Sequence, residues 1–455
     1  MQKNMRARAK MIPNRPLKVS IIHVGNMNNR GTQALISSDV HAIKTIFENS
    51  HITISTTDEN GVYNLNLPVN TITSPIIDIP FEKADQLLRK QKEKSRGVKY
   101  MFISLFYFIF MFIQASLSIF SAIFLKIGLR PFFREKILRS LKESDVVISC
   151  SDENFKEGSY LLPYNISWAL TWYSMIFSRT WDILMARFFH KRLIMFPNSV
   201  GPFRTFIGKF LSRISLSSCE TVLIREPISL NIVKEMNVST NVVLTSDSAL
   251  LHQNKIELKK TNNKPVTIGV SPGFYSNILT NEECNMYIKN HAETLDFLIN
   301  RYNVKILLLP HNVSGFKYDD LDVSKQIYNI LKNKNKVRLI ESHSLDEFLM
   351  NLKCVDIHIS SKLHPCILAV SNYIPTISIA YDHKQVGFHQ ALNLDNFVIN
   401  IRDLNSKILI EKIEYLLDNY ISIRNEVELR VTSLKARTFS EIKNSLLKPY
   451  GDKYW

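Results

Sequence analysis

The chain has few cysteines, and none of them is arranged as a metal ligand. Only five of its 455 residues are cysteine: Cys150, Cys219, Cys284, Cys354 and Cys366. They form no CxxC pair, and no cluster of histidine and cysteine has the spacing of a zinc site. An odd number of scattered thiols is typical of a reducing compartment, where we expect all five to be buried and reduced.

Other absences narrow the class of protein further. No long apolar stretch follows the basic N-terminus, so no signal peptide is expected. There is no internal repeat, and the first loop after a strand lacks the GxGxxG pattern of a dinucleotide site. The net charge is +16, which suits phosphate-bearing substrates or anionic lipid headgroups. Because no nucleic-acid-binding motif accompanies this charge, no nucleic-acid partner is expected.

The residues that are present alternate between strand and helix patterns. Short apolar runs such as 19–24 are followed by helical periodicity such as 33–47, through both halves of the chain. This predicts an α/β fold of two Rossmann-like domains that face each other across a cleft. The expected arm, N-terminal domain, linker, C-terminal domain and tail are residues 1–18, 19–252, 253–264, 265–435 and 436–455. The arm is expected to be basic and disordered.

One uncharged segment, residues 101–125, is inserted in the first domain. As a helix it would reach about 37 Å, enough to span a bilayer. A single crossing would separate strands that should share one sheet. Its polar residues recur on one helical face: Ser104, Tyr107, Gln114, Ser118 and Ser121. We therefore predict a membrane-associating insertion at about 99–126, either lying in the membrane surface or docked with its apolar side outward. A helix buried between layers is the alternative.

Loops after strands of the first domain carry candidate ligand groups. Asn29, Gly31 and Gln33 lie at a predicted helix start, where free N–H groups attract anions; an ordinary turn is the alternative. Asn198 and Ser199 follow the fourth strand and are candidate donors to a ligand, or parts of a rigid turn.

Charged residues follow two further strands of this domain. Arg225 ends a strand, where it would grip a carboxylate or phosphate through two hydrogen bonds, unless it pairs with Glu226 or another surface carboxylate. Asp152 and Glu153 make an acidic loop that suits acceptor hydroxyls rather than phosphate.

In the second domain, three strand-end loops offer histidine or lysine. They carry His311, the pair Lys362 and His364, and Lys384. A single histidine is usually structural, but parallel strands aim all three loops at one crevice. His358 lies within its strand and is predicted to belong to the core.

These motifs, in their order and spacing, resemble the polysaccharide pyruvyl transferase family. The resemblance runs from NNRGTQAL through NSVGPF, IREPIS and SDSALL to PHN, SSKLHP and YDHKQVGF, nearly the whole chain. That family is similar in fold to GT-B glycosyltransferases and transfers a pyruvyl group from phosphoenolpyruvate to a sugar. Two departures stand out. Lys362 replaces the usual arginine and lacks its planar fork, and Asp152 and Glu153 replace a glycine-rich loop.

The resemblance implies a role for each candidate residue. Phosphoenolpyruvate would be a co-substrate bound by Arg225, Lys362 and Lys384, while His364 and His311 would act as general base and acid. No cofactor or metal is implied. The acceptor or phosphate loops would comprise Asn29, Gly31, Gln33, Asn198, Ser199 and Asp152.

The acceptor would be a sugar of a cell-surface polysaccharide or its lipid-linked oligosaccharide precursor. The enzyme would then be cytoplasmic and peripherally attached to the inner face of the cell membrane. Two alternatives stay open: a GT-B glycosyltransferase that uses a nucleotide-sugar, and a non-catalytic polysaccharide-assembly protein.

Overall fold

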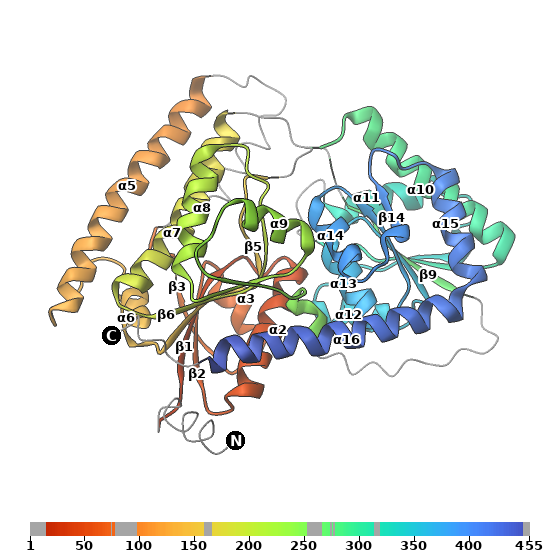
Figure 1. Cartoon of the computed structure of the whole chain (residues 1–455). Helices are drawn as coiled ribbons and strands as arrows, with labels where there is room; N and C mark the ends of the chain where they lie inside the picture. The colour runs from red at the N-terminus through yellow and green to blue at the C-terminus, as the bar shows by residue number, and fades with distance from the viewer. Residues whose placement is uncertain are drawn as a thin grey trace, which may run out of the picture.

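Two α/β domains lie next to each other in the computed structural model (Figure 1). The structure describes residues 15–73, 75–77, 98–158, 166–252, 266–273, 275, 278–313 and 319–448. The predicted linker 253–264, and the basic arm as far as residue 14, lie outside these residues.

The first domain is built on an eight-stranded parallel sheet. Its order is β3-β2-β1-β4-β6-β7-β8, and β5 pairs with β6. The strands are β1 (Lys18–Val24), β2 (His51–Thr56), β3 (Asn70–Thr73), β4 (Val146–Ser149), β5 (Asp152–Phe155), β6 (Arg192–Val200), β7 (Thr221–Ile224) and β8 (Asn241–Leu244). The helices are α2 (Arg30–Ile46), α3 (Glu59–Tyr63), α5 (Val98–Lys126), α6 (Glu135–Glu143), α7 (Ile166–Phe188), α8 (Phe206–Ser218), α9 (Pro227–Glu235) and the 3-10 helix η1 (Ser248–Leu251).

The second domain has a six-stranded parallel sheet in the order β11-β10-β9-β12-β13-β14. The strands are β9 (Thr267–Ser271), β10 (Lys305–Leu308), β11 (Val337–Leu339), β12 (Ile357–Ser360), β13 (Thr376–Ala380) and β14 (Val398–Asn400). The helices are α10 (Asn281–Tyr302), α11 (Asp320–Ile330), α12 (Leu345–Leu352), α13 (Leu363–Ser371), α14 (His383–Ala391), α15 (Ser406–Asp418) and α16 (Tyr420–Leu447), with short 3-10 turns η2 (Lys334–Lys336) and η3 (Asp395–Phe397).

Both sheets have the strand order that defines a Rossmann fold. Numbered within its domain, and leaving β5 aside, each sheet reads 3-2-1-4-5-6, with β8 added to the first. The two-domain fold predicted from the sequence is confirmed. In such sheets ligands bind where the strand order reverses, beyond the carboxyl ends of the first and fourth strands. Here those strands are β1 with β4, and β9 with β12.

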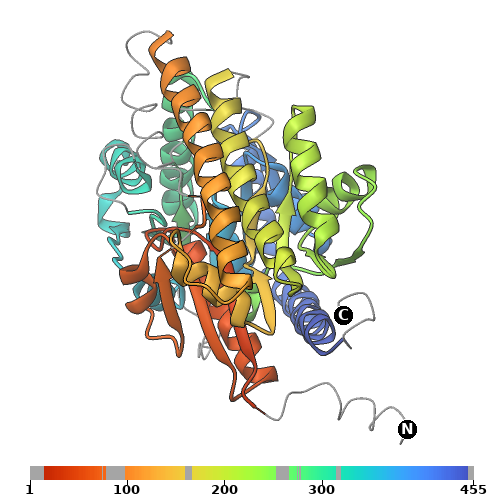
Figure 2. The same cartoon turned by 90° about the vertical axis from the view of Figure 1, so that its left-hand side faces the viewer.

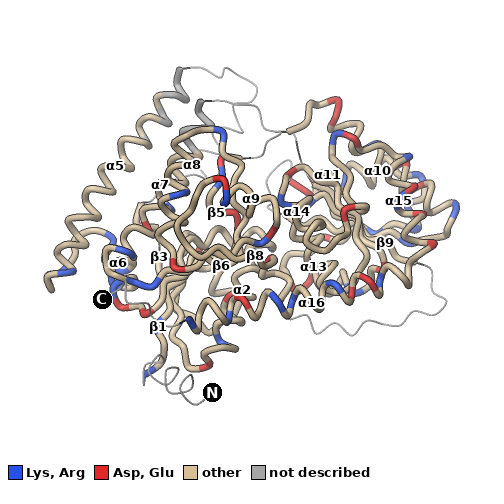
Figure 3. The backbone as a smooth tube through the Cα atoms, viewed as in Figure 1, with Lys and Arg blue, Asp and Glu red and all other residues tan. Residues whose placement is uncertain are grey.

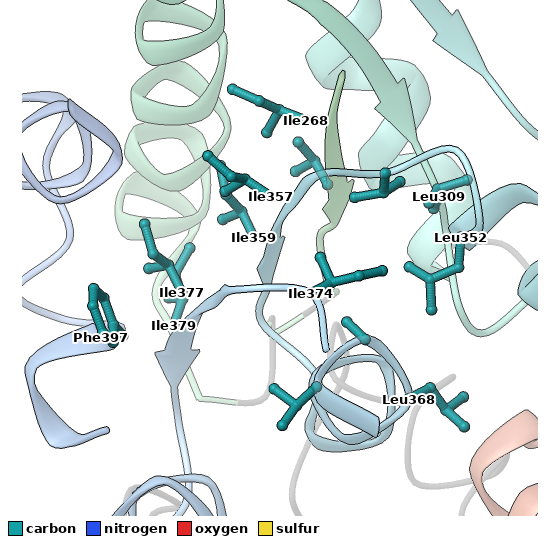
Figure 4. Close-up of a cluster of buried hydrophobic side chains, with 14 of the residues drawn as sticks. Ile268, Leu309, Leu352, Ile357, Ile359, Leu368, Ile374, Ile377, Ile379 and Phe397 are labelled. Atoms are coloured by element: carbon teal, nitrogen blue, oxygen red, sulfur yellow. The ribbon is translucent and has the colours of Figure 1, made fainter. Parts of the chain in front are cut away.

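Buried β-branched side chains hold each sheet to its helices. In the second domain, Ile268, Ile357, Ile359, Ile377 and Ile379 are all at most 1% exposed, and Figure 4 shows them gathered along the strands. Each such side chain stabilises the fold by roughly 1.5–3 kcal/mol. This rigid core fixes the loops that leave the strand ends.

Helix α16 connects the two domains. It begins in the second domain and crosses to the first, where Ile442 and Leu446 join the core cluster around β1 and β2 (Figure 1). The guanidinium of Arg192 donates to the carbonyls of Ser445 and Leu446, at 2.5 and 2.8 Å. Residues 436–447, assigned to a tail in the sequence analysis, are therefore the last turns of this helix.

The apolar helix α5 is docked on the first domain with its polar face inward. Gln114, Ser118 and Ser121 are buried, and the indole N–H of Trp181 donates to Ser118 Oγ at 2.7 Å. Figure 2 shows α5 in orange at the surface, beside α7. The docked arrangement is the one observed, and the alternative of a helix buried between layers is wrong. The side chains of Ser104 and Tyr107 lie outside the described part.

The cysteines bear out the sequence expectation only in part. All five are free, and Cys150, Cys219 and Cys366 are buried. Cys354 is exposed just after α12 and Cys284 is partly exposed on α10. The expectation of five buried thiols is wrong for these two, because Cys284 lies near the exposed start of α10 and Cys354 lies in the turn that follows α12.

Candidate active site

The loops at the two strand-order reversals meet between the domains. Gly31, in the first turn of α2, lies directly under His364, in the first turn of α13. A Cβ atom on Gly31 would overlap the imidazole ring of His364. Gly31 is thus required for the close approach of the two domains.

Arg30 holds this junction together, although the sequence analysis did not select it. Its buried guanidinium donates to the carbonyls of Pro310, His311 and Ser342 in the second domain. Burial lowers the pKa of Arg30 to about 10. A cation at the start of a helix is disfavoured by the helix dipole. The position of Arg30 at the start of a predicted helix was therefore the sequence signal that its side chain binds partners outside that helix.

Arg225 lies at the end of β7 with one edge of its guanidinium unpaired. Nε donates to Ser199 Oγ and Nη1 donates to Asp247 Oδ2, both at 2.7 Å. Nη2 is buried and has no hydrogen-bond partner among the described residues. The alternative of a surface pair with Glu226 is wrong, because the partner is the buried Asp247. The free Nη2 group is suited to a ligand anion.

Lys362 and Lys384 each hold a carboxylate. Lys362 Nζ lies 3.2 Å from Asp320 Oδ1, and Lys384 Nζ binds Glu153 of the first domain. Burial alone would lower the pKa of each lysine, but the partner carboxylate raises both. Both lysines are therefore charged, and a bound anion would replace or share their present partners.

His311 and His364 lie close together and are neutral. Their ring centroids are 6.5 Å apart, with planes 22° from parallel. Both ring nitrogens of His311, and Nε2 of His364, are buried and lack a hydrogen-bond partner in the part of the chain that the structure describes. Burial lowers the pKa of both histidines. A neutral imidazole can accept a proton, so either histidine can act as a general base. It can act as a general acid only after it has accepted that proton.

Three polar residues from the sequence analysis serve the loops themselves. Asn29 caps α2 by accepting from the Gly31 N–H at 2.9 Å, and Gln33 donates to the Met27 carbonyl at 2.6 Å. Asn198 donates to the carbonyls of Cys150 and Phe196. Their side chains therefore position the loops around the site.

The acidic loop predicted from the sequence is strand β5, at the edge of the site. Asp152 and Glu153 are only partly buried. Burial acts to raise the pKa of Glu153, but Lys156, Lys384 and Arg225 together lower it well below its usual value. This strand was missed because its residues are polar, and its pairing with Lys384 comes from the other domain.

Another contact between the domains involves His383 at the start of α14. Its Nδ1 lies 2.7 Å from Asp382 Oδ1, and its Nε2 lies 3.8 Å from Glu226 Oε1 of the first domain. Within the described ranges, no group of three or more His, Cys, Asp or Glu side chains is placed to hold a metal ion. The arrangement is therefore one of cations, carboxylates and neutral histidines.

Solved structures of known proteins share the two-domain fold. UDP-GlcNAc 2-epimerase from Neisseria meningitidis bound to UDP-GlcNAc superposes with a TM-score of 0.56 at 12% identity, over 94% of this chain and 99% of that one. Anabaena HepE in complex with UDP and glucose gives 0.52 at 11% identity, over 94% and 98%. The protein thus has a GT-B-like fold.

Sequence comparison identifies the family within this class. A family model described as polysaccharide pyruvyl transferase matches residues 66–383. The chain belongs to the polysaccharide pyruvyl transferase family. It is also 25% identical over 281 residues to the amylovoran biosynthesis protein AmsJ of Erwinia amylovora, covering 57% of this chain and 66% of that protein, just under two thirds of its length.

Proposed function

We propose that the enzyme transfers a pyruvyl group from phosphoenolpyruvate to a hydroxyl of a sugar acceptor. The observation that carries this proposal is the convergence of Arg225, Lys362, Lys384 and the start of α13 around neutral His364. Helix α13 begins at Leu363 without a side-chain cap. Its first-turn N–H groups are therefore suited to an anion. A donor with both a carboxylate and a phosphate fits several cationic groups in one site.

The reaction needs a base that accepts the proton of the attacking hydroxyl and an acid that delivers a proton to the methylene carbon. An acceptor hydroxyl adds through its oxygen to the enol carbon, and its proton is transferred to the methylene, which becomes a methyl group. Loss of phosphate then allows a second hydroxyl to attack the same carbon, which forms the ketal and releases a proton. His364 is the general base in this proposal, and His311, with its ring centroid 6.5 Å away, is the candidate general acid. Asp152 and Glu153 are the proposed acceptors of hydrogen bonds from the sugar hydroxyls.

The proposal extends to the acceptor and its location. An acceptor that belongs to a cell-surface polysaccharide or its lipid-linked precursor would be met at the inner face of the cell membrane, with the enzyme on the cytoplasmic side. No cofactor other than phosphoenolpyruvate as co-substrate is proposed. The surface that would contact the membrane is argued separately below.

Donor identity is tested by ligand-induced stabilisation. Phosphoenolpyruvate should raise the melting temperature of the purified protein, since a ligand at 100 times its Kd adds about 2.7 kcal/mol to the stability. Nucleotide-sugars should leave the melting temperature unchanged. A shift with UDP-sugars alone would contradict the proposal and favour a glycosyltransferase. No shift with either donor, together with no phosphate release, would favour a non-catalytic assembly protein.

A second prediction concerns Lys362. Lys362→Ala should weaken phosphoenolpyruvate binding about 10- to 100-fold, because a hydrogen bond to a charged group contributes roughly 1.5–3 kcal/mol. Lys362→Arg should keep or improve the affinity, since arginine binds carboxylates through two parallel bonds. Titration calorimetry of each variant measures both effects.

The matched control is Lys325→Ala. Lys325 also pairs with a carboxylate, Glu341 at 3.3 Å, but on the exposed surface of the second domain. Its removal should leave donor affinity unchanged. Equal affinity in Lys362→Ala and the wild type would remove Lys362 from the donor site.

A further inference from the structure

A large apolar surface on the first domain is exposed among the residues that the structure describes. The outward face of α5 exposes a run of aromatic and aliphatic side chains: Phe102, Leu105, Phe106, Ile109, Phe110, Phe112, Ile113, Leu117, Ile119, Phe120, Ile123 and Phe124. Phe106 is 65% exposed and Phe120 is 57% exposed. We name this set the α5 face. A contiguous apolar area of this length on one helix is typical of a surface that binds a partner or a membrane.

Helix α8 exposes a second apolar group in the same helical layer. Phe206 is 79% exposed, and its ring stacks on that of Phe210 at 5.7 Å between centroids. Ile207 is exposed beside them, and so are the basic residues Lys209 and Arg213. The 13 residues of α8 include no acidic side chain. Exposed aromatic residues interleaved with basic ones are the pattern of a helix at a lipid interface.

The two helices belong to one layer. Helix α5 packs against α7, and α7 packs against α8. Figure 2, which faces this side of the molecule, shows α5 in orange, α7 in yellow and α8 in yellow-green next to one another. Helix α5 itself carries no charge along this face: from Phe102 to Leu125 the chain has no charged residue, and Lys126 ends α5 (Figure 3). An apolar centre with a basic margin matches an anionic bilayer better than it matches a protein partner.

We propose that the α5 face and the exposed side of α8 together form a bilayer-docking surface, with α5 lying in the membrane plane. Residues 108–126 are long and apolar enough to cross a bilayer. However, β3 before α5 and β4 after it belong to the same sheet, so both ends of α5 stay on one side. The polar face of α5 is held by Trp181 and by Ser121, which exchanges hydrogen bonds with the backbone of Phe133. Membrane docking by this surface does not depend on whether phosphoenolpyruvate is the donor.

The exposure of individual side chains decides which residues of α5 should be substituted to test membrane binding. The sequence favours Phe108→Asp with Phe112→Asp, since both lie off the polar stripe. Phe108, however, is partly buried against the core, and Phe112 contacts Phe177 at 5.4 Å between centroids. Those substitutions would perturb the fold. Phe106, Phe110 and Phe120 are better targets because all three are exposed.

The experiment is flotation of the full-length protein with vesicles of phosphatidylcholine alone or with one quarter phosphatidylglycerol. The wild type should bind the anionic vesicles. The triple variant Phe106→Asp, Phe110→Asp and Phe120→Asp should bind them at least about 100-fold less, since each apolar anchor is replaced by a charge. Lys209→Gln with Arg213→Gln should weaken only anionic binding, about fivefold per charge.

The matched control changes three exposed apolar residues of the second domain, Met350→Asp, Ile421→Asp and Leu429→Asp. This variant should float like the wild type, and thermal melting should show that all variants are folded. Failure of the wild type to float would overturn the proposal, and so would flotation of the α5 triple variant. A wild-type dimer that the triple variant dissociates, without vesicle binding, would assign the surface to a second copy. A terminal tag protected from protease inside sealed vesicles would show a crossing helix instead.

Discussion

Gly31→Ala is expected to lower kcat/KM for pyruvyl transfer at least about 100-fold. The new methyl group would overlap the ring of His364, so the ring must move or the domains must separate. Misplacing a reacting group by about 1 Å is enough for a loss of this size. The measurement is phosphate release from phosphoenolpyruvate with a sugar acceptor, alongside a thermal melt.

Gly25→Ala is the matched control for this prediction. Gly25 precedes the same helix, and nothing lies within 4 Å of the position a Cβ would take. It should keep near wild-type activity. The double variant Gly31→Ala with His364→Ala should recover the wild-type melting temperature without recovering activity. Full activity in Gly31→Ala would show that the observed contact is not needed for the reaction.

The free energy of unfolding should fall by several kcal/mol as the pH drops from 6.5 to 5. Burial lowers the pKa of His291 to about 4 and that of His358 to about 3. It also lowers those of His311, His364 and His389. The unfolded chain binds protons near pH 6.5 that the folded chain does not. A histidine that stays neutral throughout this interval, such as His358, therefore destabilises the fold by roughly 2 kcal/mol as the pH falls.

Carboxyl groups reduce this effect without cancelling it. Burial raises the pKa of Asp39 to about 7, so its contribution has the opposite sign. His23 and Asp182 are 3.8 Å apart and shift in opposite directions, to about 3 and about 7, so they oppose each other. Urea unfolding at pH 7.5, 6.5 and 5 measures the slope, and His358→Asn should make it shallower. Constant stability across this range would contradict the burial of neutral histidines.

Most of the fold could be predicted because its strands are buried on both faces. Runs such as KVSIIHV and KILL are almost continuously apolar, as expected of parallel strands covered by helices. Every strand that the sequence predicts is present in the structure. Two further strands, β3 and β5, were not expected. Their sequences, NTIT and DENF, are polar. They lie beside apolar strands, and this pairing, rather than their own hydrophobicity, makes them strands.

The meeting of the candidate loops could be predicted from the sequence, but the charge balance between them could not. The loops that carry Arg225, His364 and Lys384 do meet between the domains. The sequence could not show that each cation already has a carboxylate, because the partners are distant in the chain. Glu153 and Lys384 are 231 residues apart, and Asp247 comes from the loop after β8. Pairing across domains depends on the three-dimensional arrangement, which no local motif encodes.

The path of α16 has a consequence for how the protein is made. Ribosomes synthesise a chain from its N-terminus to its C-terminus. Ile442 and Leu446, which complete the core of the first domain, are therefore among the last residues to be made. The first domain therefore lacks part of its core until synthesis has almost ended, and it must wait while the entire second domain is translated. During that interval the apolar surface that α16 later covers is available to chaperones. A premature stop codon near residue 440 would consequently damage the domain encoded first.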